Sequence, residues 1–173
     1  PLATHLFSIK DEDYKSDWME HRRVFDLLIP FIDSSTQDRI IVEDRGCDDE
    51  KRFMYFMNEL HCSFVTRIMA GNGSRGVIVK DEDGNERVCN IQDLANQLKD
   101  KASNERQWYN RKVKKNLTSK IAYQKVYLPG HKDIPLYAVF VYSQDYDQPL
   151  VVLTDLITED AEGAWKHFFY YKK

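Results

Sequence analysis

The sequence is poor in cysteine and lacks a long apolar run. Its cysteines are an odd number, stand far apart and show no CxxC spacing, so neither a disulfide framework nor a zinc site is expected; they are Cys47, Cys62 and Cys89. No apolar run approaches the roughly 20 residues that a membrane helix needs, and the first residues do not follow the pattern of a signal peptide. We therefore expect a soluble protein of the cytoplasm that has no membrane partner.

Acidic charge is almost absent from one stretch of the chain. Residues 101–132 carry nine Lys and Arg against the single acid Glu105, although the net charge of the whole chain is −3. Acidic residues gather elsewhere, for example in KDEDGNE at 80–86. A near-neutral average can conceal a divided surface, so the basic stretch is a candidate for contact with a polyanion.

Apolar spacing in the first part of the chain alternates between strand and helix. Residues 2–9 have the composition of a strand, and a helix is predicted from Ser16 to about Pro30. A short buried strand, a helix and a further strand are predicted at 39–43, 48–60 and 63–69. This order is typical of an α/β protein whose sheet has crossover connections.

The pattern becomes mainly β after these elements. β-forming residues flank the pairs Asp83-Gly84 and Pro129-Gly130, so we expect two hairpins, with a short helix at 91–98 between them. An apolar strand at 149–156 and a last helix from Ala161 return to the alternation of strand and helix seen in the first part of the chain. The chain is therefore divided into a first core part at 1–70, a β-rich insertion at 71–147 and a last core part at 148–173.

Asp44 stands at the end of the buried strand, which is where open sheets hold their ligands. A metal-dependent phosphoryl-transfer site needs hard oxygen ligands on rigid elements, because Mg²⁺ prefers carboxylates and keeps several waters. Glu43 alternates to the opposite face of the strand and is not expected to share the site of Asp44. The alternative is structural: Asp44 starts a turn and Asp48 caps the next helix.

Two further features suit binding of nucleic acid. The stretch RQWYNRKVKKNLTSK interleaves Trp108 and Tyr109 with cations, and cations meet phosphates while aromatic rings stack on bases. The alternative is a solvated, lysine-rich face. Arg67 lies in the otherwise β-branched strand FVTRI, so it needs either a ligand or a salt-bridge partner.

The histidines and Cys47 offer weaker signals. The five histidines show no metal-ligand spacing, and we expect all of them to be structural or surface residues. Cys47 lies close to Asp44, but no histidine is near it in sequence, so a nucleophile is not expected. GNGSRG at 71–76 lacks the Lys-Ser/Thr pair of a phosphate-binding loop.

Several of these pieces, in this order, resemble the DDE-type insertion-sequence transposases, which have a ribonuclease H-like core. The matching pieces are IIVEDRGCDD, with an Asp followed by Arg and Gly; FVTRI, of the form FVxR; a mainly β insertion; and the apolar strand LVVLTDL before a helix that reaches Tyr171. In the family this helix continues as Tyr, two residues, Arg, three residues, Glu. The resemblance implies an α/β, ribonuclease H-like mixed sheet with helices, interrupted by a mainly β insertion.

The resemblance also implies roles for individual residues. Asp44 would be the second of three catalytic carboxylates and a ligand of Mg²⁺ or Mn²⁺. The DNA-binding residues would be Arg67, near the transposon end, and Tyr171, which would help to hold a phosphate. The basic part of the insertion would follow the DNA backbone, and the cations that would contact phosphates there are Lys112, Lys114, Lys115 and Lys120. Trp108 would be the candidate for holding a flipped base.

The first Asp and the Glu of such a triad are expected outside these 173 residues, since both ends are interpreted as cuts in a longer polypeptide. The chain by itself is therefore expected to be catalytically silent. The intact protein would be a homodimer on two DNA ends, in a prokaryotic cytoplasm and associated with the nucleoid, with no small-molecule substrate. The alternatives are a non-catalytic nucleic-acid-binding module and a metal-dependent nuclease of the same fold, which would show no preference for inverted-repeat ends.

Overall fold

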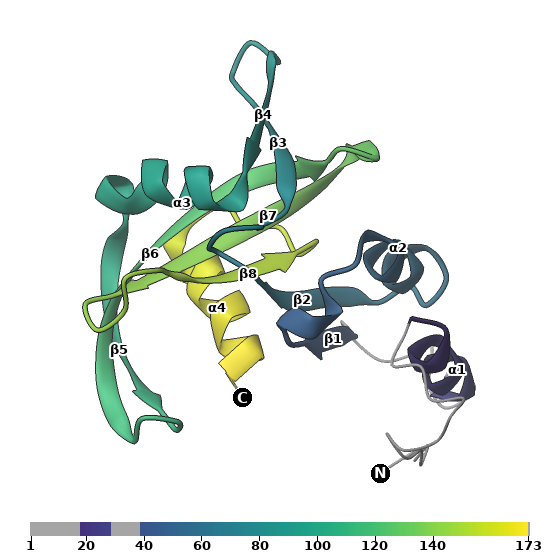
Figure 1. Cartoon of the computed structure of the whole chain (residues 1–173), viewed down its shortest axis with the longest axis horizontal. Helices are drawn as coiled ribbons and strands as arrows, with labels where there is room; N and C mark the ends of the chain where they lie inside the picture. The colour runs from purple at the N-terminus through teal and green to yellow at the C-terminus, as the bar shows by residue number, and fades with distance from the viewer. Residues whose placement is uncertain (1–17, 29–38, 173) are drawn as a thin grey trace.

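The computed structural model describes residues 18–28 and 39–172, and it shows an α/β protein with a mixed eight-stranded sheet and, in this part of the chain, four α-helices (Figure 1). The prediction of an α/β fold is confirmed at this level. The strand predicted at 2–9 lies outside the described residues.

The first elements follow the apolar pattern of the sequence closely. They are α1 (Trp18–Leu28), β1 (Ile40–Glu43), a 3₁₀ turn (Arg45–Cys47), α2 (Glu50–Asn58) and β2 (Ser63–Ile68). The cap of α2 differs from the expected one: the carboxylate of Asp49, not Asp48, accepts from the backbone N–H of Lys51. Asp48 instead forms an ion pair with Arg75, at 2.6 Å. β1 was predicted to be buried but is only partly so, with Val42 44% exposed, because it stands at the end of the strand order.

The β-rich part contains both predicted hairpins and one strand that was not predicted. Its elements are β3 (Gly76–Lys80), β4 (Glu86–Asn90), α3 (Ile91–Leu98), a 3₁₀ turn (Lys99–Lys101), β5 (Ser103–Asn110), β6 (Lys115–Leu128) and β7 (His131–Ser143). The chain then continues through β8 (Leu150–Thr154) and α4 (Ala161–Lys172). The basic stretch thus folds into a third hairpin, made by β5 and the first half of β6.

The eight strands belong to one sheet, in the order β1-β2-β8-β7-β6-β3-β4, with β5 also paired to β6. β1 and β2 are parallel, as expected of two strands joined through the crossover helix α2, and the other pairs are antiparallel. β8 lies between β2 and β7. The strands of the β-rich segment therefore extend the same sheet that carries β1 and β2.

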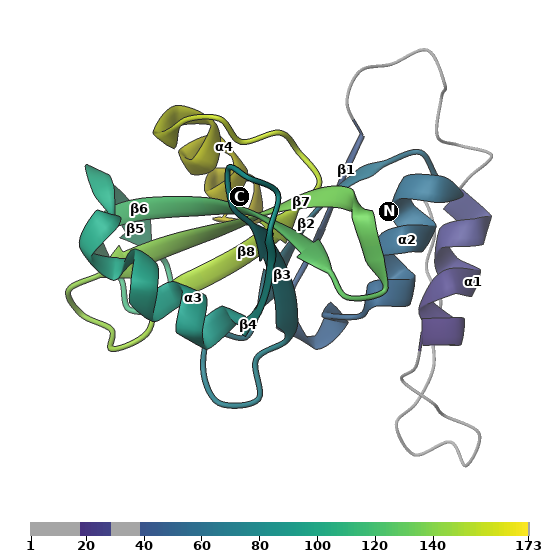
Figure 2. The same ribbon diagram turned by 90° about the horizontal axis from the view of Figure 1, so that it is seen from above.

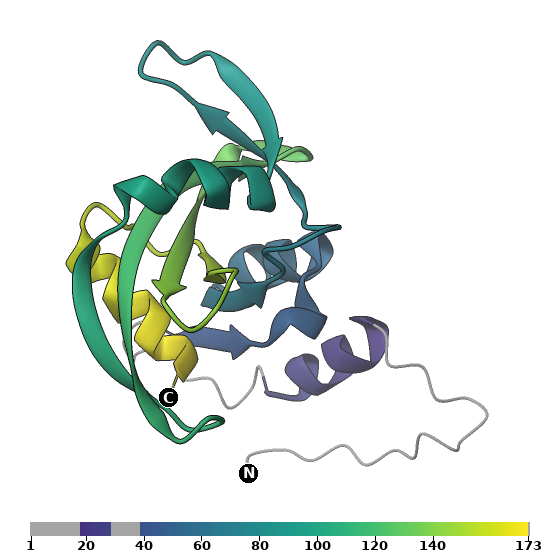
Figure 3. The same cartoon turned by 60° about the vertical axis from the view of Figure 1, so that its left-hand side comes forward.

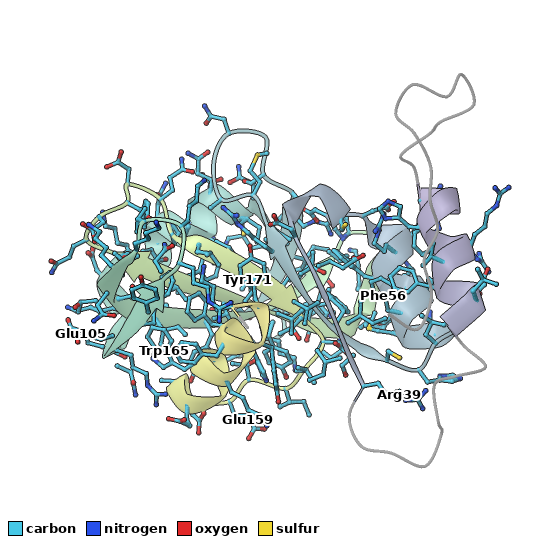
Figure 4. All side chains as sticks on the ribbon, turned by 90° about the horizontal axis from the view of Figure 1, so that it is seen from below. Arg39, Phe56, Glu105, Glu159, Trp165 and Tyr171 are labelled. Carbon is cyan, nitrogen blue, oxygen red and sulfur yellow. The ribbon has the colours of Figure 1, made fainter. Side chains whose placement is uncertain are left out.

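Side chains on the two faces of the sheet form two hydrophobic cores. One core joins the sheet to α2 and α3 and includes Phe56. The other joins the opposite face to α4 and includes Trp165 and Phe168. Figure 2 shows α3 and α4 on the two sides of the sheet, and Figure 4 labels Phe56 and Trp165. Because α4 packs across β2, β6, β7 and β8, its last turn is brought to the end of β1.

A buried histidine lies under α4. His167 is 5% exposed, and its Nδ1 lies 3.0 Å from the hydroxyl of Thr158, which directs its one hydrogen to the carbonyl of Leu156. Nδ1 therefore carries a hydrogen and donates it to Thr158. Burial, with a smaller contribution from the charge of Lys166, lowers the pKa of His167 to about 4.

This histidine makes stability depend on acid. Its folded-state pKa lies below the unfolded value of about 6.5, so the stability associated with the neutral ring is complete above pH 6.5 and is lost as the pH falls toward 4. Between these pH values we expect this group to lower the free energy of unfolding by up to about 3 kcal/mol, as measured by urea denaturation. His167→Asn, which keeps a donor but does not titrate, should flatten this part of the profile, whereas His61→Asn, at an exposed position, should not. Identical profiles for the two variants would contradict the assignment.

Candidate functional site

Asp44 begins the loop that follows β1. Its carbonyl accepts from the backbone N–H of Cys47 at 2.9 Å, which closes the 3₁₀ turn, and its carboxylate projects into solvent with 68% of the side chain exposed. The turn role considered as an alternative is therefore real, but it uses the backbone and leaves the carboxylate to other partners.

Arg67 is the neighbour of Asp44 on the next strand. The parallel register pairs Glu43 with Thr66, so the following residues of the two strands come side by side. Nη1 of Arg67 lies 3.6 Å from Oδ1 of Asp44. Arg67 alternates with the buried Thr66 and Ile68 and lies on the face that α4 covers. The arginine in an apolar strand thus has an ion-pair partner, and both side chains of this pair remain accessible to solvent.

Tyr171 completes this group from the far end of the chain. It lies on the last turn of α4, where Figure 4 labels it. It is 127 residues from Asp44 in the chain, and its hydroxyl donates to Oδ1 of Asp44 at 3.1 Å. Burial raises the pKa of Tyr171 most strongly, and the charge of Asp44 raises it further while Arg67 lowers it. The phenol is therefore held in its protonated, donating form.

Lys172 adds a second cation that sequence reasoning missed. Its Nζ lies over the ring of Trp108, 4.5 Å from the centroid. Burial is the main cause that lowers the pKa of Lys172. The charge of Arg67 lowers this pKa further, whereas the charge of Asp44 raises it. One cation, Arg67, and the phenol of Tyr171 therefore contact one exposed carboxylate, and the charge of Lys172 is near enough to interact with it. Such an arrangement can also receive a phosphate oxygen.

Trp108 lies in the core rather than on the surface. It is 8% exposed, its indole N–H donates to Oγ of Ser119 at 3.0 Å, and its ring meets that of Phe168 edge-on at 5.2 Å. A base could stack on this ring only after Lys172 moved away. The next residue, Tyr109, is 57% exposed and is the better placed aromatic for stacking.

The four lysines singled out from the sequence do not form one surface. Lys112 and Lys114 lie in the turn between β5 and β6, whereas Lys115 pairs with Asp145 at 2.8 Å. Lys120 faces the other side of the sheet, where it lines a pocket of about 440 Å³ with Tyr142. Figures 1 and 3 show the β5–β6 hairpin extending toward the side of the molecule where α4 ends. The turn lysines are therefore on the same side as Asp44.

The group around Asp44 fits a divalent metal in part. The carboxylate offers the hard oxygen that Mg²⁺ or Mn²⁺ takes, and its exposure leaves room for the waters such an ion keeps. Arg67 and Lys172 oppose a second positive charge at the same place. Asp44 can therefore serve as one ligand of an ion whose other charges are balanced by further carboxylates or by phosphate.

Comparison with known proteins adds no assignment. No protein-family model matches the chain, and no curated protein matches it. In the part of the chain that the structure describes, no helix has the length and apolar character to cross a bilayer.

Proposed function

We propose that this chain is part of the catalytic domain of a DDE-type DNA transposase with a ribonuclease H-like core. The observation that carries the proposal is the meeting of Asp44, Arg67 and Tyr171, because these three residues belong to separate short motifs and yet lie at one point. The parallel strands β1 and β2, the crossover helix α2 and the packing of α4 across the sheet are compatible with such a core without being specific to it.

In this proposal some residues of the site bind the metal and others bind the phosphate. When bound, a divalent metal would polarise the attacking water or DNA 3′-hydroxyl and stabilise the leaving oxygen. Asp44 would hold that metal together with carboxylates from outside the described residues. Arg67 and the hydroxyl of Tyr171 would donate to phosphate oxygens, in place of the bonds that they now make to Asp44.

The hairpin formed by β5 and β6 would guide DNA to the site. Lys112 and Lys114 are exposed in its turn, and exposed cations neutralise phosphates without reading sequence. Tyr109, on the exposed face of β5, would replace Trp108 as the aromatic that stacks on an unpaired base. The intact protein would act as a homodimer on two transposon ends, in a prokaryotic cytoplasm.

The proposal predicts that Asp44 links magnesium to DNA binding. At constant ionic strength, we expect Mg²⁺ to tighten binding of the wild-type chain to a duplex about fivefold more than binding of Asp44→Asn. The reason is that Mg²⁺ removes the repulsion between one carboxylate and one phosphate, which is roughly 1 kcal/mol for unit charges about 4 Å apart in water. Fluorescence anisotropy of a labelled duplex measures both dissociation constants.

Asp133→Asn is the matched control, since Asp133 is an exposed carboxylate on β7. It should respond to Mg²⁺ as the wild type does. An equal magnesium response in wild type and Asp44→Asn would contradict a metal ligand at Asp44.

The second candidate is a non-catalytic nucleic-acid-binding module, and the observation that favours it is the exposed pair of turn lysines. In that case Lys112→Ala and Lys114→Ala would each reduce the slope of log K against log salt by about 0.9, while Asp44→Asn would leave the magnesium response unchanged. The same titrations therefore separate the two functions.

A further inference from the structure

A second group of chemically reactive side chains lies on the opposite face of β1 from Asp44. His21 comes from α1, Glu43 is the last residue of β1, and Cys47 ends the 3₁₀ turn. One ligand atom from each of the three side chains lies within 4.8 Å of the other two, and all three residues are half-buried. No spacing in the sequence indicates this group, because its members come together only when α1 packs against α2.

The carboxylate of Glu43 points into this group with an unused oxygen. Its side chain is 9% exposed. Oε1 accepts from Nη1 of Arg52 at 2.8 Å, whereas Oε2 is fully buried and, among the described residues, meets no donor in good hydrogen-bond geometry. The thiol of Cys47 also interacts with this carboxylate. A buried carboxylate oxygen without a partner is costly, so a native fold that retains one calls for an explanation such as an ion.

The imidazole of His21 already directs a lone pair toward a positive charge. Its Nδ1 lies 2.8 Å from the same Nη1 of Arg52. A guanidinium donates and cannot accept, so Nδ1 is the unprotonated nitrogen of the ring. This is the form in which histidine binds metals. Two acceptors of the group, Oε1 of Glu43 and Nδ1 of His21, thus converge on one cationic group.

We propose that His21, Glu43 and Cys47 bind a borderline transition-metal ion of the Zn²⁺ class. Imidazole nitrogen, thiolate sulfur and carboxylate oxygen are the ligand types of zinc, and Mg²⁺ would reject two of the three. Tetrahedral zinc with bonds of 2.0–2.3 Å sets its ligand atoms about 3.5 Å apart, so small side-chain rotations close the present spacing. The site differs in chemistry and position from Asp44, and it stands independently of the proposed function.

Arg52 defines the two states of the site. Without metal, its guanidinium is the cation that His21 and Glu43 share. With metal, Arg52 keeps its bond to Oε1 of Glu43 and gives up His21, while Oε2 binds the ion. A hydrogen-bonded outer oxygen of this kind orients a ligating carboxylate, and Arg52 offsets part of the added negative charge of the Cys47 thiolate. Bound metal would fix α1 and the 3₁₀ turn to the end of β1.

The test uses Co²⁺ as the spectroscopic probe and Zn²⁺ as the competitor on the whole chain. We expect one equivalent of Co²⁺ to give the thiolate-to-cobalt charge-transfer band, and Zn²⁺ to abolish it. Cys47→Ser should remove the band, and His21→Asn should weaken Co²⁺ binding at least about tenfold. Cys89→Ser is the matched control, because Cys89 is also a free, half-buried cysteine, and it should keep the full band.

Unchanged far-ultraviolet circular dichroism of each variant confirms that it folds. Absence of the band in the wild type, or its persistence in Cys47→Ser, would overturn the proposal. Asp44→Asn should keep the band, and its loss in that variant would place the metal at Asp44 instead. The fate of the magnesium-linked DNA binding at Asp44 is a separate result, so the two ideas can fail independently.

Discussion

Arg52→Met is expected to lower the free energy of unfolding by about 3–5 kcal/mol. Arg52 and Glu43 form a buried ion pair with side chains that are 5% and 9% exposed, and Nη1 of Arg52 lies 2.8 Å from Oε1 of Glu43. Removing the cation leaves the carboxylate buried without a partner, which is the costly half of breaking such a pair. The guanidinium also lies 5.1 Å from the ring centroid of Trp18, and this contact is lost as well. Urea denaturation at pH 7 measures the change.

Arg22→Met provides the comparison at an exposed site. Arg22 pairs with Glu59 at 2.6 Å, but the two side chains are largely open to solvent, so the expected loss is only about 0.2–1 kcal/mol. The double change Arg52→Met with Glu43→Gln should recover part of the stability, because it removes the unpaired charge. Equal losses in the two single variants would show that the Arg52 pair is not effectively buried.

Trp165→Ala is expected to cost about 3–5 kcal/mol, the range for deleting a large buried aromatic side chain. Trp165 is fully buried, its ring meets that of Phe168 at 5.6 Å, and its indole N–H donates to the carbonyl of Asn104 at 2.9 Å. The change therefore removes packing and also leaves a carbonyl of the β5 strand without its donor. Because α4 carries Tyr171, the variant should also lose the alignment of that hydroxyl with Asp44.

Lys166→Ala is the control on the same helix. Lys166 is exposed, so its removal should change the free energy of unfolding by less than about 0.5 kcal/mol. Urea denaturation measures both variants. A loss for Trp165→Ala below about 1 kcal/mol would mean that α4 is not held to the sheet by this side chain.

The elements that the sequence predicted correctly are those with an uninterrupted apolar signal. β1 and β2 are short apolar runs, α2 has helical spacing, and Asp83-Gly84 stands at the turn between β3 and β4. β5 was missed because alternate side chains on it are exposed and polar. Only Trp108 and Asn110 on this strand are buried, and a lysine-rich continuation hides that alternation.

The site was predictable in its parts and not in its assembly. Asp44 and Arg67 could each be singled out, since a carboxylate follows an apolar strand and a cation interrupts a β-branched one. Lys172 could not, because only the packing of α4 brings its cation toward the carboxylate of Asp44. The same limit applies to His21, which lies far from Cys47 in the chain. Local sequence patterns indicate whether a side chain will be buried, whereas these contacts depend on the order of the strands and the placement of the helices.

The position of β8 has a consequence for how the chain folds. This strand is synthesised after all the other described strands, yet it lies in the interior of the sheet and joins β2, more than 80 residues earlier, to β7. Such distant pairings require loop closure before they contribute stability, which slows folding. Until β8 arrives, β2 and β7 each present an unpaired edge, and unpaired edges promote association between nascent chains. A chaperone that shields these two edges during translation would therefore act at the step on which the whole sheet depends.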